Sequence, residues 1–322
     1  MNNFKKIGLT ALAGSLVATS VYAGEMSVAG SASLRMSNHA GTDGGKTMAM
    51  GNQLTFTGSG EMDNGMNVAL SFILDQGDNT VDAEAATTAA GTGGPFDSHS
   101  ITISSDAMGS VVFAGEGASS AQNTIDTTAA GDIWDNTFTG YTAATNASAG
   151  TKTLTWTLPS MVDGLGVVTS YNGSSAGEEG TIGYALTYTG VEGLSVSYGV
   201  GEVGDTTAGT GGREVTTYKA SYAFGPVTAA MSMNDYDITS AANEEQSSYK
   251  ISYTVSDELS VSYGSETHET TGQTTDEEFD QISVSYTSGG LTATVSQTNA
   301  DNITGATLTE QSKWNVGLSF AF

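Results

Sequence analysis

Three short motifs in the chain match sequences that carry catalytic groups in enzymes. Residues 199–204 spell G-x-G-x-x-G, residues 173–177 spell G-x-S-x-G, and residues 247–250 spell S-x-x-K. The first two motifs need a helix after them, to hold a phosphate or to complete the nucleophile turn, and no helical pattern follows either one. In the third motif, Ser247 and Lys250 would lie on opposite faces of a strand. The chain is therefore not expected to be an enzyme.

Acidic residues dominate the charged groups of this chain. Asp and Glu number 35 against 9 Lys and Arg, which gives a formal charge of −26 over 322 residues. This excess argues against a nucleic-acid partner, because phosphate binding needs Lys and Arg to displace counterions. The sequence contains no Cys, which excludes disulfides, thiol nucleophiles, zinc–thiolate sites and iron–sulfur clusters. Charged residues are only 14% and apolar residues 38%, both below the averages of soluble domains.

The N-terminal segment has the pattern of a secretory signal peptide. Lys5 and Lys6 form a basic start, residues 7–21 are mostly apolar, and Ala23 ends a cleavage motif of small residues. The apolar run is shorter than the ~20 residues that a membrane-spanning helix needs. We therefore expect cleavage after Ala23, which leaves seven bases against 35 acids and a charge of −28 in residues 24–322.

The rest of the chain alternates apolar and small polar residues with a period of two, which is the pattern of β-strands. In residues 66–75, for example, Met66 and Val68 share one face, and Asn67 and Ser71 share the other. About 16 such runs occur, joined in pairs by short connections and separated by long ones rich in Asp, Gly, Thr and Ala. This pattern predicts an all-β protein, a transmembrane antiparallel up-and-down β-barrel of about 16 strands.

The two faces of the predicted strands differ in polarity. One face is apolar, and the other carries Ser, Thr and Gly, so a packed core on both sides is not expected. The apolar face should meet lipid, carry no charge in mid-strand and hold the tyrosines, whereas the polar face should line a water-filled lumen. The aromatic residues predicted on the lipid face are Trp156, Tyr171, Tyr184, Tyr188, Tyr198, Tyr218, Tyr222, Phe224, Tyr249, Tyr253, Tyr263, Tyr286 and Phe320.

The ends of the predicted strands follow the ends of the apolar alternation. The hairpin 217–234 turns at residues 225–226, and the hairpin 247–265 turns at residues 255–258. A last run, residues 312–322, ends the chain.

The mature chain resembles the general porins of Gram-negative outer membranes, most closely the alphaproteobacterial type. The resemblance rests on the signal peptide, the paired strands, the run 98–116 before a long third connection, and the terminal strand with Trp314, Phe320 and Phe322. It implies a homotrimer of 16-stranded barrels in the cell outer membrane, each with its own pore. It also implies that the third loop folds inward and that the outer-membrane assembly machinery reads Phe322 as a signal.

The third connection, about residues 117–150, is the expected constriction. It exceeds the ~12–15 residues beyond which a loop without its own structure is usually functional or disordered. It contains Asp126, Asp132 and Asp135, and Glu116 lies at its start on the lumen face. We interpret it as a constriction lined by carboxylates, and the alternative is a solvated outer loop.

Four bases are predicted on the lumen face. They are Arg35, Lys219, Lys250 and Lys313. Carboxylates on an inward loop that face cations on the wall would create a transverse field, and rings of charge set ion preference. The alternative for each base is an ordinary solvated position. The negative charge and the few wall bases predict a porin for passive diffusion of ions and small hydrophilic solutes, with weak to moderate cation preference.

Two other functions stay open at this point. A substrate-specific porin would need extra aromatic or basic lumen residues, and a secreted β-rich surface protein or adhesin would be soluble with a two-sided core. The acidic loops could hold calcium through carboxylates, but no twelve-residue EF-type spacing occurs, so no metal site can be named. No cofactor is expected.

Overall fold

The structure is a computed structural model of the whole chain. It describes the following parts of the chain. These are residues 24–38, 46–75, 96–116, 119–125, 128–133, 138, 152–173, 180–203, 212–239, 241–303 and 310–322. The predicted signal peptide, residues 1–23, lies outside these ranges, and its cleavage stays a prediction.

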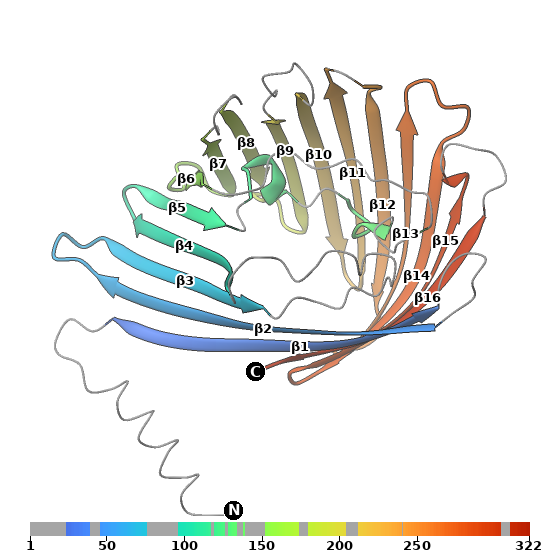
Figure 1. Cartoon of the computed structure of the whole chain (residues 1–322), viewed down its shortest axis with the longest axis horizontal. Coiled ribbons are helices and arrows are strands. Elements are labelled where there is room, and N and C mark those ends of the chain that lie inside the picture. Colours follow the sequence, from blue (N-terminus) through green and yellow to red (C-terminus); the bar gives the residue numbers. More distant parts are fainter. Residues whose placement is uncertain are drawn as a thin grey trace, which may run out of the picture.

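The described residues form sixteen antiparallel strands in a closed barrel (Figure 1). The strands are β1 (Glu25–Asn38), β2 (Lys46–Glu61), β3 (Asn67–Asp75), β4 (Phe96–Ser105), β5 (Gly109–Glu116), β6 (Thr153–Thr157), β7 (Leu165–Asn172), β8 (Thr181–Tyr188), β9 (Leu194–Val203), β10 (Arg213–Phe224), β11 (Val227–Ile238), β12 (Glu244–Thr254), β13 (Leu259–Thr270), β14 (Glu277–Ser288), β15 (Leu291–Asp301) and β16 (Gln311–Ala321). Each strand pairs with its neighbours in sequence, and β1 pairs with β16 to close the ring. The predicted up-and-down barrel is confirmed.

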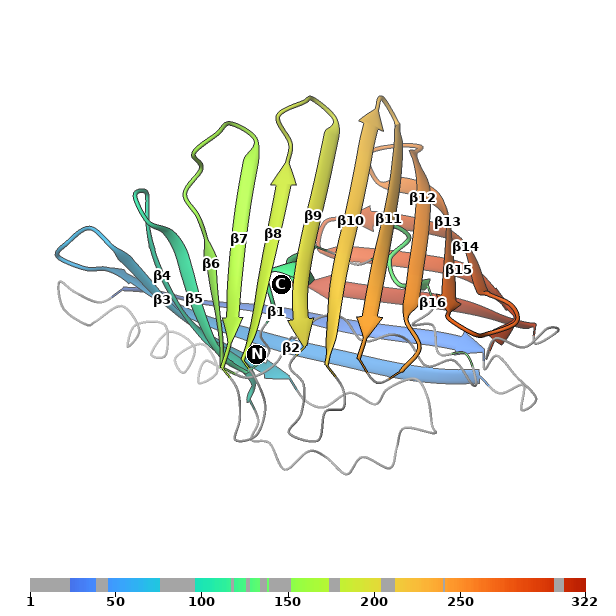
Figure 2. The same ribbon diagram turned by 90° about the horizontal axis from the view of Figure 1, so that it is seen from above.

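The two ends of the barrel differ in the length of their connections. Short turns join the strands of each hairpin at one end, and Figure 2 shows those between β6 and β7, β8 and β9, and β10 and β11 along one edge. Gly109 and Gly193 take φ values of +78° and +75° at such turns, a conformation that glycine adopts without a Cβ clash. The longest connections lie at the opposite end, which we call the loop end, although the connections 239–243 and 271–276 there are short.

The C-terminal residue helps to close the ring. The amide of Gly30 donates a hydrogen bond to the carbonyl of Phe322 at 2.7 Å, and the amide of Phe322 donates to the carbonyl of Gly30 at 2.9 Å. The Phe322 ring leaves no space for a side chain at Gly30. On the same seam, the Arg35 guanidinium donates two hydrogen bonds to Asn315 Oδ1, at 3.1 and 3.3 Å.

The outward face is apolar and the inward face polar, as predicted. Met231 and Ile251 point outward and are more than half exposed, whereas Ser232 and Ser248 point inward and are buried. All the aromatic residues predicted on the lipid face are exposed there. Soluble monomers rarely expose apolar surface on this scale, so the outward face fits a bilayer and not water. The two-sided core that a soluble surface protein would need is not present among the described strands.

Tyr236 in β11 and Phe279 in β14 depart from the predicted aromatic pattern. Both point inward and are almost completely buried, with 2% and 1% of their surface exposed. Tyr236 packs with Val215 of β10, and its hydroxyl meets Gln246 Oε1 at 3.4 Å. The prediction that tyrosine avoids the inward face is therefore wrong at Tyr236, because this part of the lumen wall is covered and can hold an aromatic ring.

Several strands in the second half of the barrel continue farther toward the loop end than predicted. β10 begins at Arg213 and β11 ends at Ile238, four residues beyond the predicted hairpin at each end. The added segments carry outward carboxylates, such as the register partners Asp235 and Glu245. The apolar outward residues of β11 form a band over 227–233, ~20 Å long along the strand at about 3.4 Å per residue. The predicted uncharged face is therefore limited to this band, and the prediction is wrong for Asp235 above it.

The third connection lies inside the barrel. Its described residues 119–125, 128–133 and 138, here called the inner segment, include the short 3-10 helix η1 (Gln122–Thr124), which lies within the curve of the wall beside β8 and β9 (Figure 1). Two buried apolar clusters sit between this segment and the wall. One joins Ala121 and Ile125 to Ala185, and the other joins Ala130, Ile133 and Phe138 to Phe279, Ala300 and Ile303. The predicted inward-folded loop is confirmed. No described helix is both long and apolar enough to span a membrane.

Candidate pore constriction

Serine hydroxyls on the lumen wall hold the backbone of the inner segment. The amide of Ala121 donates to Ser170 Oγ of β7 at 2.7 Å. Farther along, the amide of Ala129 donates to Ser232 Oγ of β11 at 2.9 Å, and the amide of Ala130 donates to Ser248 Oγ of β12 at 2.8 Å. Segment amides that would otherwise be buried without partners are thus satisfied by the wall.

A chain of buried amides and hydroxyls anchors η1. Gln122 Nε2 donates to Thr217 Oγ1 of β10 at 2.7 Å, and Thr217 Oγ1 donates to Asn234 Oδ1 of β11 at 2.7 Å. Asn234 Nδ2 in turn donates to Gln246 Oε1 of β12 at 3.3 Å. Since Gln122, Thr217 and Asn234 are fully buried, each hydrogen bond replaces water that cannot reach these groups.

Asp132 of the inner segment and Lys219 of the wall both hydrogen-bond to Thr128, at one turn of the segment. The Thr128 hydroxyl donates to Asp132 Oδ1 at 2.8 Å and accepts from the Asp132 amide. Lys219 Nζ of β10 donates to the carbonyl of Thr128 at 3.1 Å. The structure thus brings a predicted constriction carboxylate and a predicted wall cation to the same turn. Lys219 supports the loop backbone and is more than a solvated lumen residue.

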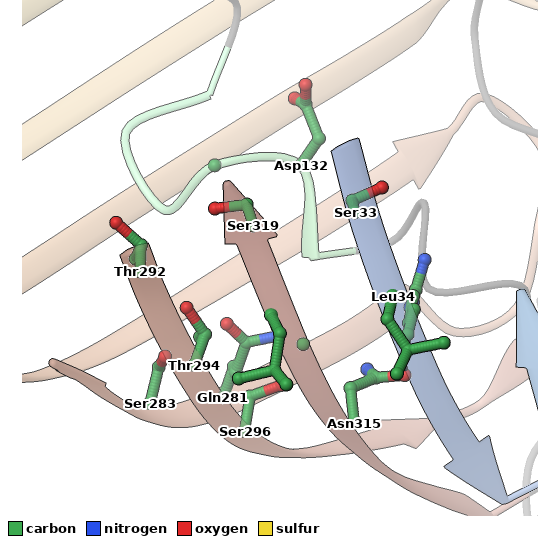
Figure 3. Close-up of a pocket in the computed structure, with 14 residues that line it drawn as sticks. Ser33, Leu34, Asp132, Gln281, Ser283, Thr292, Thr294, Ser296, Asn315 and Ser319 are labelled. Atoms are coloured by element: carbon green, nitrogen blue, oxygen red, sulfur yellow. Dashed lines mark hydrogen bonds between the residues drawn. The ribbon is translucent and has the colours of Figure 1, made fainter. Parts of the chain in front are cut away.

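A cavity on the lumen side lies between Asp132 and the wall of β14, β15, β16 and β1. This cavity of about 500 Å³ is bounded by Asp132 on one side and by Arg35 and the hydroxyls of β14, β15, β16 and β1 on the other. Figure 3 shows Asp132 on the inner segment, with Thr292 and Thr294 on β15 and Ser319 on β16. Arg35 and Asp132 are the charged residues among the cavity's described lining. The lining is otherwise rich in neutral hydroxyl and amide groups, which suits water and hydrophilic solutes.

The structure places some of the other predicted lumen residues, and others lie outside the described residues. Lys250 faces the lumen from β12 and is half-buried, whereas Lys313 of β16 is almost enclosed, with 2% of its surface exposed. Glu116 ends β5, but the position of its side chain lies outside the described residues, as do Asp126 and Asp135. Phe322 lies at the barrel seam and is exposed, and its recognition by assembly machinery stays a prediction.

A group of lumen residues near the loop end was missed from the sequence. His268 of β13 is buried, with Nδ1 at 3.2 Å from Glu277 Oε2 of β14 and Nε2 at 3.3 Å from Glu244 Oε2 of β12. Both imidazole nitrogens therefore face carboxylate acceptors, which requires both to donate. Arg213 also faces the lumen, at the start of β10. In the sequence, the only sign of these residues was that inward and outward positions keep alternating beyond the apolar part of each strand.

A second cavity lies at the loop end of β11 to β14. Its volume is about 470 Å³. Its lining contains six carboxylates and no base, namely Asp235, Asp237, Glu244, Glu245, Glu269 and Asp276. Asp235, Asp237, Glu245 and Glu269 lie at outward positions of their strands, so the cavity lies on the outer side of the rim at the loop end. Like charges on adjacent strands repel one another, so this rim carries a concentrated negative potential that attracts cations.

Comparison with known proteins settles the family to which this barrel belongs. A family model described as Gram-negative porin matches residues 8–322. The chain belongs to the Gram-negative porin family. A porin is a channel of the outer membrane, which agrees with the polar lumen and the apolar outer face. A comparison with curated protein sequences finds no match to this porin.

Solved porin structures share the fold at low sequence identity. The anion-selective porin from Comamonas acidovorans is 13% identical with a TM-score of 0.69, covering 93% of this chain and 100% of that chain. OmpF of Salmonella typhi, in complex with daunomycin, is 14% identical with a TM-score of 0.72, covering 93% and 98%. OmpT of Vibrio cholerae, with loop L8 deleted, is 14% identical with a TM-score of 0.67, covering 93% and 100%. At such identities the likeness shows the fold alone.

Metal ligation by this porin remains a prediction without a named site. Among the residues that the structure describes, no group of three or more His, Asp or Glu side chains is arranged to hold a metal ion. The predicted calcium binding at acidic loops is not tested by this observation, because much of those loops lies outside the described ranges.

Proposed function

We propose that this porin forms a water-filled channel for passive diffusion of ions and small hydrophilic solutes. The observation that carries the proposal is the inner segment, which is tethered inside a closed barrel beside a hydroxyl-lined cavity of about 500 Å³. A constriction of this kind admits solutes that can exchange water for hydroxyl and amide contacts. The inward aromatics Tyr236 and Phe279 are covered, so they do not offer a stacking surface of the kind a sugar-specific pore would use.

The channel is proposed to prefer cations weakly. Inside the barrel the signs are mixed, because Arg35, Lys219 and Lys250 share the lumen with Asp132 and other carboxylates. At the loop end, six carboxylates and no base line the second cavity on the rim of β11 to β14. A negative potential at this rim enriches cations near the channel entrance, and it is screened by salt over ~10 Å at 0.1 M and ~3 Å at 1 M. The preference should therefore weaken as salt increases.

Reversal potentials in planar bilayers test both statements. The purified porin is expected to conduct, and the sign of its potential in a potassium chloride gradient should indicate cation preference, more strongly near 0.1 M than near 1 M salt. Absence of conductance would refute the channel, whereas conductance with anion preference would refute only the proposed selectivity.

The predicted constriction carboxylates give a second arm of this experiment. Asp132→Asn combined with Asp135→Asn is expected to shift the reversal potential toward zero, because two negative charges leave the inner loop. Asp163→Asn is a matched control, since Asp163 lies in the short turn between β6 and β7 at the opposite end of the barrel. An equal shift in the control would place the selectivity outside the constriction.

The porin is further proposed to assemble as a homotrimer through β1 to β5. The exposed Tyr and Trp side chains of the described outer face all lie on β6 to β14, and residues 24–116 contain neither residue type. Interfacial Tyr and Trp mark surfaces that face lipid headgroups, so their absence favours a protein partner on β1 to β5. This face instead exposes methionines, whose adaptable side chains suit a packed interface. They are Met26, Met36, Met48 and Met50.

Light scattering of the detergent-extracted porin tests this assembly. Wild type is expected to have the mass of three copies, and Val28→Lys on β1 is expected to release single barrels because it buries a charge between copies. Val196→Lys on β9, also an exposed outward valine, should leave three copies together. A single-copy mass for wild type, or dissociation by Val196→Lys alone, would contradict the proposed face.

A further inference from the structure

Three glycines on the lumen wall lie directly beneath the inner segment. A Cβ added at Gly264 of β13 would lie 2.8 Å from Ala130 Cβ and 3.3 Å from Ile133 Cδ1. One added at Gly199 of β9 would lie 2.9 Å from Ile125 Cδ1 and 3.3 Å from Gln122 Cα. At Gly183 of β8 it would lie 2.7 Å from Ser170 Oγ and 3.4 Å from the amide of Ala121. The segment therefore occupies the space that side chains would take.

Two inward glycines of the wall, Gly166 and Gly317, have no such neighbour. Gly166 of β7 faces the lumen closer to the short-turn end, and a Cβ there would approach only the carbonyl of Thr187, at 3.8 Å. At Gly317 of β16 a Cβ would meet nothing within 4 Å. Since Gly lowers strand stability and Val favours strands, the glycines under the segment hold positions where strand propensity alone would prefer a larger residue.

We propose that Gly183, Gly199 and Gly264 are positioning residues that set how far the inner segment projects into the pore. This inference rests on the proposed channel function. Together with the serine tethers, the glycines form a shallow seat in the wall, and the depth of the seat fixes the distance between Asp132 and the opposite wall. The protein interior tolerates little overlap, so added bulk in the seat must move the segment.

The inner segment can move only toward the side on which there is free space. The wall lies behind the segment, and the cavity of about 500 Å³ lies in front of it, bounded by Asp132 and Arg35. A larger side chain at Gly264 pushes on Ala130, two residues from Asp132, and displaces the segment toward that cavity. The pore becomes narrower although the substituted residue is hidden from the solute. A substitution at Gly166 adds the same side chain to the wall without touching the segment.

Single-channel conductance of matched variants tests the proposal. Gly264→Val is expected to lower conductance by on the order of 1.5-fold and to reduce the largest sugar that enters porin-loaded liposomes, because pore diameter controls both. Gly166→Val should conduct like wild type. Adding Ala130→Gly to Gly264→Val removes the Cβ that the new side chain meets, so the double variant should regain conductance.

The rescue separates displacement of the segment from damage to the strand. Conductance of Gly264→Val equal to that of Gly166→Val, or a loss that Ala130→Gly fails to restore, would overturn the inference while leaving a conducting wild type intact. A wild type that does not conduct would instead overturn the proposed function. Assembly of every variant is checked by heat-modifiable migration in gels. If Gly264→Val does not assemble, Gly199→Val, which meets Ile125, tests the same inference with the same expected narrowing.

Discussion

Ile251→Lys is expected to destabilise the folded barrel in a phospholipid bilayer by about 2–4 kcal/mol. Ile251 lies on the outward face of β12 between Tyr249 and Tyr253, and about half of its surface is exposed. In the bilayer this surface meets hydrocarbon, where an ammonium group has neither water nor a carboxylate to hydrogen-bond. Unfolding by guanidinium chloride in vesicles, followed by gel mobility, measures the free-energy difference from wild type.

Ser252→Lys is the matched control for this prediction. Ser252 is the next residue of β12 and points to the lumen, as Lys250 does on the other side of Ile251. Its added charge stands in a polar lumen, so we expect a change near zero in unfolding free energy and a measurable change in ion selectivity. Similar destabilisation by both substitutions would contradict the assignment of outward and inward faces in β12.

His268→Leu is expected to lower stability by on the order of 3 kcal/mol at neutral pH. The imidazole bridges Glu244 and Glu277 across three adjacent strands, and its own side chain and that of Glu277 are almost completely buried. Leucine fills a similar volume but leaves two carboxylates near each other without a donor. The penalty therefore comes from desolvated, unpaired charge and not from a cavity.

The pH dependence of this variant distinguishes the cause. The penalty comes from negative charge on the two carboxylates, so acid conditions that remove this charge should shrink the deficit of His268→Leu relative to wild type. His268→Gln retains an amide donor for one carboxylate and should recover part of the stability. A deficit that is independent of pH and unchanged in the glutamine variant would indicate a packing defect instead.

The barrel itself could be predicted because its cause is local. The sequence of each hairpin by itself shows the period-two alternation and the short turn. The closing contact of Phe322 with Gly30 follows once sixteen antiparallel strands are present. The strand ends could not be predicted equally well. Residues 235–238 and 244–246 lie above the lipid band, where the outward positions turn acidic and the apolar signal stops although strand pairing continues.

The position of the constriction required the structure. Ser170, Ser232 and Ser248 bind the inner segment, yet in the sequence they resemble every other inward serine of the wall. Asp132 was predicted on this loop, and the Lys219 bond to Thr128 placed both charges at one turn. Such pairings join residues about 50 to 120 positions apart, and no local periodicity encodes them.

The seam between β1 and β16 has a consequence for the order of biogenesis. Arg35 and Asn315 are 280 residues apart in sequence, close to the full span of residues 24–322. Contacts of such separation form late, because the entropy of joining distant segments must be offset first. A nascent chain that stops before Gln311 lacks β16, and β1 keeps an open hydrogen-bonding edge that invites aggregation. Only a chain that includes β16 can therefore hide both edges.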